Sequence, residues 1–141
     1  MGLAVVLRDS EGNMLAARCE MRRGCLPPAA AEAQALLLAI SLCREMGLER
    51  VQLEGDAKTV IDAVSSTEID YSWMGHITED IKLELNFLVH SRVSFVKREG
   101  NKVAHSLAKY AVRNCISKSW RDVPPACICD MLALEHSALV A

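Results

Sequence analysis

Two acidic residues and one histidine of this 141-residue sequence are spaced so that they could form a small metal-binding site. Glu32 lies in the first turns of a segment rich in alanine and leucine, and Asp56 directly follows the strand-like run "RVQLEG" at 50–55. Carboxylate oxygens are the ligands that Mg²⁺ prefers, and the ion keeps some of its own waters. Glu32 and Asp56 therefore predict a site for a hard divalent cation, Mg²⁺ or Mn²⁺.

The histidine, His105, belongs to the stretch "NKVAHSLAKY" at 101–110. The apolar side chains Val103, Leu107 and Tyr110 recur at i, i+4 and i+7, as on one face of a helix. Three interpretations of His105 remain open: a residue that lines the site, a partly buried histidine with a hydrogen-bond partner, or a general base. As a ligand for Mg²⁺ its imidazole nitrogen is inferior to a carboxylate oxygen.

The distribution of charge favours a partner that carries phosphates. Residues 92–121 contain eight Lys or Arg and one acid, whereas residues 1–91 contain eight bases and fourteen acids. A basic segment beside an acidic body is typical of a phosphate-binding flank next to a carboxylate site, although a solvated basic helix face is the alternative. The candidates for nucleic-acid contacts are Lys97, Arg98, Asn101, Lys102, Lys109 and Arg113.

The first half of the sequence predicts a hairpin, a long helix and a strand. The runs at 3–8 and 14–20 flank the turn "DSEGN" and predict a β-hairpin. Residues 29–46 contain no Gly or Pro and predict a helix that Gly47 ends. The strand at 50–55 is followed by a short helix at 57–66, for which Asp56 is the expected N-cap.

The second half predicts a helix at 73–89, a strand at 92–99, a turn at 100–101 and a helix that ends near residue 114. Strands that alternate with helices after a hairpin indicate an α/β domain with a mixed sheet. Strand ends and the starts of neighbouring helices meet at one edge of such a sheet, which brings Glu32 and Asp56 together. The aromatic residues Trp73, Phe87, Phe95 and Trp120 are expected in the core, not as platforms for stacking bases.

The composition is that of one globular domain with an aliphatic core, since 51% of the residues are hydrophobic and 4% are aromatic. No apolar run approaches the length of a membrane span, and the N-terminus reads as a strand, not as a secretory signal. The six cysteines form no C-x-x-C pair. Reduced thiols in an intracellular protein, nuclear or cytoplasmic, are the corresponding expectation.

Three segments together resemble a ribonuclease H-type domain of the plant, reverse-transcriptase-associated, retroelement-derived kind. They are "GLAVVLRDSEGNML", "AEAQALLLAISLCREMGLERVQLEGDAKTVIDAV" and "VSFVKREGNKVAHSLAKYAVRN". The resemblance implies a mixed sheet flanked by helices over residues 1–122. Within the tail at 123–141, the sequence itself predicts one short helix in the last dozen or so residues.

The implied activity is hydrolysis of the RNA strand of an RNA–DNA hybrid by two metal ions. Glu32 and Asp56 match two of the family's metal-binding acids, and His105 completes the implied catalytic set. The implied partners are nucleic acids, an RNA–DNA hybrid or RNA, without a membrane. Composition and resemblance leave the oligomeric state open.

The sequence departs from the family pattern at two acids. The family's first acid lies on the first central strand, upstream of "GLAVVLRDSEG", and Asp9 in the hairpin turn cannot replace it. The fourth acid is replaced by His105 in the pattern N-K-V-A-H-S-L-A. We therefore expect weak or lost hydrolysis, with a non-catalytic nucleic-acid-binding or protein-interaction module as the alternative.

The apparent absence of the first central strand also has a structural consequence. We expect either that the true chain extends upstream, or that the hairpin at 3–20 pairs directly with the strand at 50–55. An unpaired apolar edge would be prone to aggregation.

Overall fold

The computed structural model describes residues 1–132, which form two compact units. The first unit comprises residues 1–24 and 102–132, and the second comprises residues 25–101. Helices, an antiparallel sheet and a parallel sheet confirm the expected mixed α/β class. Among the described residues, no helix has the length and apolarity required to cross a membrane. The predicted domain boundary at residue 122 stays a prediction.

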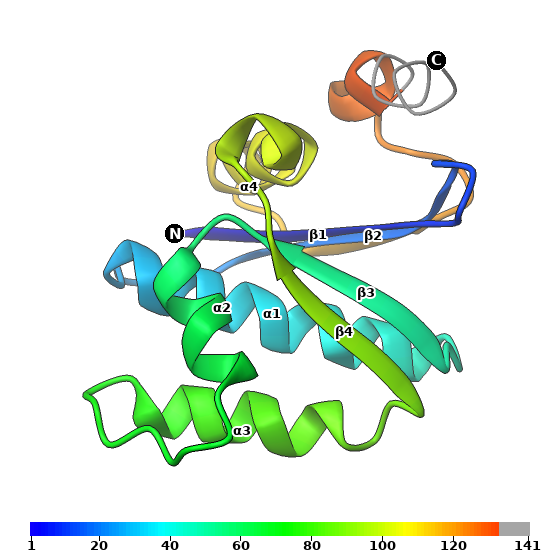
Figure 1. Ribbon diagram of the computed structural model, residues 1–141. Helices are drawn as coiled ribbons and strands as arrows, with labels where there is room; N and C mark the ends of the chain where they lie inside the picture. Colours follow the sequence, from blue (N-terminus) through cyan, green and yellow to red (C-terminus); the bar gives the residue numbers. More distant parts are fainter. Residues whose placement is uncertain (133–141) are drawn as a thin grey trace. The chain divides into compact units, whose positions relative to one another are not determined.

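The first unit is built on the predicted β-hairpin (Figure 1). Strands β1 (Gly2–Arg8) and β2 (Met14–Met21) pair antiparallel. The Asp9 carboxylate oxygen Oδ1 accepts hydrogen bonds from the backbone amides of Glu11 and Asn13, both at 2.9 Å. Asp9 therefore shapes the turn, as its position in the sequence predicts.

A third strand joins this sheet at the edge of β2. Strand β5 (Lys118–Arg121) pairs antiparallel with β2, which gives the order β1-β2-β5. The sequence did not predict this four-residue polar strand, because only tertiary pairing stabilises it. Of the two alternatives for the first central strand, direct pairing of the hairpin with the strand at 50–55 is wrong, since that strand pairs in the other sheet. The other alternative, an upstream extension, stays a prediction.

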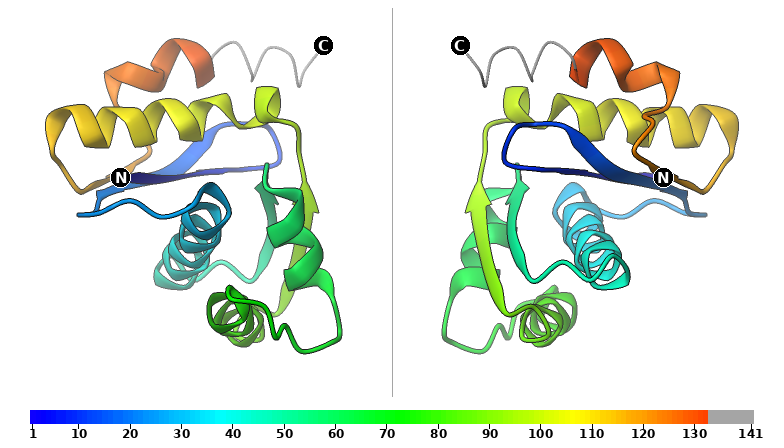
Figure 2. Two further views of the ribbon diagram at one scale, coloured as in Figure 1. Left: turned by 90° about the vertical axis from the view of Figure 1, so that its left-hand side faces the viewer. Right: turned by 90° about the vertical axis from the view of Figure 1, so that its right-hand side faces the viewer.

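Helix α4 (Lys102–Asn114) packs on the hairpin and supplies three of the eight buried residues in the core of the first unit. Its buried face, Val103, Leu107 and Ala111, contacts small residues of β1 and β2. Residues 126–132 are helical and lie beside α4, where Ile128 closes the core (Figure 2). The expected helix in the C-terminal tail therefore begins earlier, and the part of that prediction beyond residue 132 lies outside the described residues.

The second unit combines a two-stranded parallel sheet with three helices. Strand β3 (Arg50–Gly55) pairs with β4 (His90–Phe95) along their full lengths. Helix α1 (Pro28–Glu45) contacts β3 and α3 (Gly75–Leu85), and α2 (Lys58–Ser65) contacts β4. Gly47 ends the long helix with a positive φ of 68°, as predicted. A 3₁₀ turn, η1 (Arg98–Asn101), leads to α4.

Three predicted boundaries in this unit are wrong. Helix α3 spans 75–85 instead of 73–89, because residues 86–88 bond to carbonyls only three residues back and form turns. Strand β4 spans 90–95 instead of 92–99, because the parallel register places these six residues opposite β3. The N-cap of α2 is Ala57 instead of Asp56, and it makes no side-chain capping bond.

The aromatic residues also differ from expectation. Trp73, Phe87 and Phe95 are exposed, whereas Trp120 is half-buried beside Tyr110, with ring centroids 6.4 Å apart. Aliphatic residues already fill the core of the second unit, so its aromatic side chains are not needed there. The prediction that all four lie in the core is therefore wrong for three of them.

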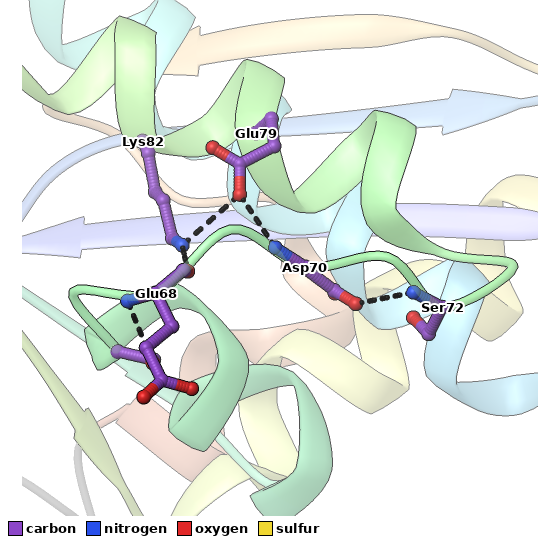
Figure 3. A network of polar contacts seen from close by, with 6 residues as sticks. Glu68, Asp70, Ser72, Glu79 and Lys82 are labelled. Atoms are coloured by element: carbon purple, nitrogen blue, oxygen red, sulfur yellow. Dashed lines mark hydrogen bonds and ion pairs between the residues drawn. The ribbon is translucent and has the colours of Figure 1, made fainter.

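A hydrogen-bonded network holds the loop at 66–74 against α3 (Figure 3). The Asp70 amide donates to Glu79 Oε1 at 2.9 Å, and Asp70 Oδ1 accepts from the Ser72 amide at 2.8 Å. Lys82 Nζ donates to the Glu68 carbonyl at 2.7 Å and to Glu79 Oε1 at 3.1 Å. Hydrogen bonds from Ser72 lower the pKa of Asp70. The pKa of Glu79 is lowered mainly by the hydrogen bond from the Asp70 amide and further by the one from Lys82.

We expect acid to loosen this loop. Because folding lowers both pKa values, the network stabilises the fold above the ordinary pKa values of Asp and Glu. That contribution disappears as the pH falls through the lowered values, below the ordinary 3.8 of Asp70 and 4.5 of Glu79. An NMR titration of the Ser72 and Asp70 amide shifts measures this, and midpoints at or above the ordinary values would contradict it.

Candidate metal and nucleic-acid site

The Glu32 side chain reaches Gly55, the last residue of β3. A larger residue at position 55 would crowd the Glu32 carboxylate. A side chain at Gly55 would place its Cβ 3.0 Å from Glu32 Oε1 and 3.3 Å from Ile61 Cδ1. The Glu32 carboxylate therefore lies directly over the last residue of β3, between α1 and α2. Sequence reasoning missed Gly55, although its place immediately before Asp56 in "LEGDA" was a visible signal.

Asp56 follows Gly55 and, like Glu32, is half-buried. The second unit thus brings both acids to the carboxyl end of β3, where ligands bind in α/β folds. Two carboxylates supply oxygen donors, but within residues 1–132 no three His, Cys, Asp or Glu side chains gather closely enough to hold a metal ion. Their role as metal ligands stays a prediction.

His105 is half-buried on α4, between the buried residues Val103 and Leu107 in the sequence. It belongs to the first unit, whereas Glu32 and Asp56 belong to the second. Its membership of the same site therefore stays a prediction from the sequence pattern. Ser106, the next residue, contacts Met131 Sδ at 3.2 Å through its hydroxyl.

The exposed face of α4 carries a line of cations that we call the basic stripe: Lys102, Lys109 and Arg113. Their spacing of i, i+7 and i+11 places them within an arc of roughly 40° on a 3.6-residue helix. All three are exposed, and no acid occurs between residues 102 and 121. The basic stripe is thus free to meet a polyanion, while the buried face of α4 contacts the hairpin.

The other predicted contacts lie in the segment before α4. Lys97 and Arg98 are exposed, and Asn101 is half-buried at the end of η1. The Gly100 amide donates to the Lys97 carbonyl at 2.9 Å, which forms the turn that the sequence predicts. These residues belong to the second unit, and their binding role stays a prediction.

Comparison with known families agrees with this arrangement of elements. The family model described as reverse transcriptase-like matches residues 1–111. The mixed α/β fold and this match define an RNase H-type domain. The chain belongs to the reverse transcriptase-like family and is of retroelement origin. A search of curated proteins gave no match. The family membership supports a general RNase H-like function related to nucleic acids.

Proposed function

We propose that this domain binds an RNA–DNA hybrid and hydrolyses its RNA strand weakly, with a divalent cation held by Glu32 and Asp56. The observation that supports this most directly is the Glu32 carboxylate lying over Gly55, next to Asp56. Family membership supports the substrate class, and the basic stripe supports binding to phosphates.

The two carboxylates fit a magnesium ion that is shared with a substrate. Mg²⁺ commonly uses one or two protein carboxylates together with phosphate oxygens and waters. When bound, the ion supplies charge stabilisation at the phosphate and lowers the pKa of a bound water. Glu32 and Asp56 would hold and orient it, and the contact with Gly55 restricts where the Glu32 oxygens can lie.

Weak hydrolysis follows from the small number of donors. The described residues contain no group of three side chains that could bind a metal. The two carboxylates alone therefore supply little negative charge to attract a cation. A cation then binds tightly only when phosphate oxygens contribute as well. We expect turnover to require millimolar cation and to be faster with Mn²⁺, which binds N and O ligands more tightly than Mg²⁺ does.

The decisive experiment follows cleavage of an RNA–DNA hybrid labelled on the RNA strand. The proposal requires a product that appears with Mg²⁺ or Mn²⁺, disappears with a chelator, and is not formed from the matching DNA duplex. Cleavage that persists with the chelator would overturn it, because that activity would come from a metal-independent contaminant or mechanism.

The basic stripe should determine how strongly hybrid binding depends on salt. Each phosphate contact contributes about 0.9 to the slope of log K against log salt concentration. Replacing Lys102, Lys109 and Arg113 by glutamine should therefore reduce the slope by about 2–3, measured by fluorescence anisotropy with a labelled hybrid. Lys58→Gln, an exposed lysine paired with Asp62, is the control. An unchanged slope in the triple variant would exclude the basic stripe as the binding surface.

A methyl group at position 55 should impair the metal site without unfolding the domain. In Gly55→Ala the new Cβ displaces the Glu32 carboxylate, which is the movable end of a flexible side chain. We expect Mn²⁺ affinity to fall about tenfold, since changes to the surroundings that orient a metal ligand have effects of this order. Titration of Mn²⁺ followed by NMR line broadening measures the loss, and unchanged affinity would show that Glu32 is not a ligand.

A non-catalytic nucleic-acid-binding module is the second candidate. The absence of a three-residue metal group within residues 1–132 favours it. It predicts hybrid binding that is insensitive to divalent cations, unaffected by changes at Glu32 and Asp56, and never followed by cleavage.

A further inference from the structure

Three large apolar side chains, one aliphatic and two aromatic, project from the loop between α2 and α3. We call this surface the aromatic ledge. Ile69, Tyr71 and Trp73 alternate along the loop and are 61%, 89% and 70% exposed. Clustered apolar side chains on a surface mark interaction sites more often than scattered ones do. Tyrosine and tryptophan are also the residues that most often dominate binding energy at interfaces. The aromatic ledge is therefore a candidate docking surface.

The loop that carries the aromatic ledge is anchored. Asp70, between Ile69 and Tyr71, makes the hydrogen bonds to Glu79 and Ser72 seen in Figure 3. Its backbone carbonyl packs against Gly75 so closely that a side chain at position 75 would collide with it. A surface that is already ordered loses less entropy when it binds. The backbone that carries the aromatic side chains is thus ordered before a partner arrives.

The charge around the aromatic ledge indicates the chemistry of that partner. Residues 66–82 contain four acids and one base, Lys82, which is paired with Glu79. Farther along α3, a hollow of about 390 Å³ is lined by the apolar Leu37 and Leu83 and by the polar Ser41, Asp80 and Glu84. Glu84 is paired with Arg44, whereas the Asp80 carboxylate makes no hydrogen bond or ion pair with another side chain of the described residues. This negative surface repels phosphates and attracts cations.

We propose that the aromatic ledge and the Asp80 hollow bind a basic segment of a partner protein. Lysine or arginine side chains stack on the faces of Tyr71 and Trp73, where ring quadrupoles attract cations. A further cation enters the hollow, with its stem against Leu37 and Leu83 and its charge near Asp80. This function lies outside the hybrid-binding role and does not depend on it, because it uses neither the carboxylates at β3 nor the basic stripe.

The test uses the full chain and a labelled peptide, GRLRGRLRGRLR, with GELEGELEGELE as the charge-reversed control. Fluorescence anisotropy should show binding of the arginine peptide only, and the affinity should decrease as salt is added. Trp73→Ala and Tyr71→Ala should each weaken binding about fivefold, and Asp80→Asn about threefold. Val123→Ala and Glu11→Gln, at exposed positions outside the loop, should leave it unchanged.

Three results would overturn the proposal. The first is equal affinity of the arginine peptide for the wild type and Trp73→Ala. The second is Trp73-dependent binding of single-stranded oligothymidylate in place of the peptide, which would make the aromatic ledge a base-stacking surface. The third is Trp73-dependent self-association in sedimentation velocity, which would make a second copy of the chain the occupant. Hybrid cleavage is not measured in this test. Failure of the basic-segment proposal can therefore be distinguished from failure of the nuclease proposal.

Discussion

Cleavage of an RNA–DNA hybrid is expected to fall about a hundredfold or more when Glu32 is replaced by glutamine or Asp56 by asparagine. Each change removes one negative charge and one anionic oxygen ligand but keeps the shape of the side chain. Since the proposal assigns two carboxylates to the metal, either change removes half of the charge that they supply. Stabilisation of this kind is worth several kcal/mol, at 1.36 kcal/mol for each factor of ten.

A second readout separates this expectation from a simple loss of folding. In the wild type, Mn²⁺ should broaden the NMR signals of the Gly55 and Asp56 amides, and neither variant should show this effect at the same concentration. Hybrid binding measured without cation should be unchanged or stronger, because a negative charge near the phosphates is removed. Glu54→Gln, at an exposed position on β3, is the matched control. Full cleavage by both variants would refute the metal site.

Replacing Leu107 by alanine is expected to lower the free energy of unfolding by about 2–5 kcal/mol. Leu107 is fully buried on α4, where it packs with residues of β1, β2 and the helical segment at 126–132. The lost side chain leaves a cavity that a helix fixed across a sheet cannot close. Since a domain has only about 5–15 kcal/mol of stability, this is a large fraction of the total.

Urea denaturation followed by far-ultraviolet circular dichroism measures this loss. Val123→Ala serves as the control, because Val123 is 74% exposed and its truncation should change stability by about 0.5 kcal/mol or less. A loss below about 1 kcal/mol for Leu107→Ala would mean that α4 is not firmly packed on the hairpin.

The regular elements were predictable because their signals are local. The long helix at 28–45 is a run of strong helix formers that Gly47 ends, and the hairpin is defined by its "DSEGN" turn. The alternation of strand and helix also predicts that Glu32 and Asp56 lie at the same end of β3. That placement needs only the topology, since strand ends in such folds converge at one edge.

The contacts that the sequence could not supply depend on groups far apart in the chain. Strand β5 exists only because β2 offers it an edge about a hundred residues away in the sequence, as the Arg18–Ser119 hydrogen bond shows. The exposure of Trp73 could not be inferred from composition, since an apolar side chain is buried only where the surrounding elements leave room for it.

The sequence by itself therefore determined the fold class, most of the helices and strands, and the two acids of the candidate site. The tertiary structure decided that Gly55 leaves space for the Glu32 carboxylate, that the basic stripe faces outward on α4, and that an anchored loop displays the aromatic ledge. The physical reason is that propensity and periodicity act over a few residues, whereas steric fit and burial depend on the whole packed chain.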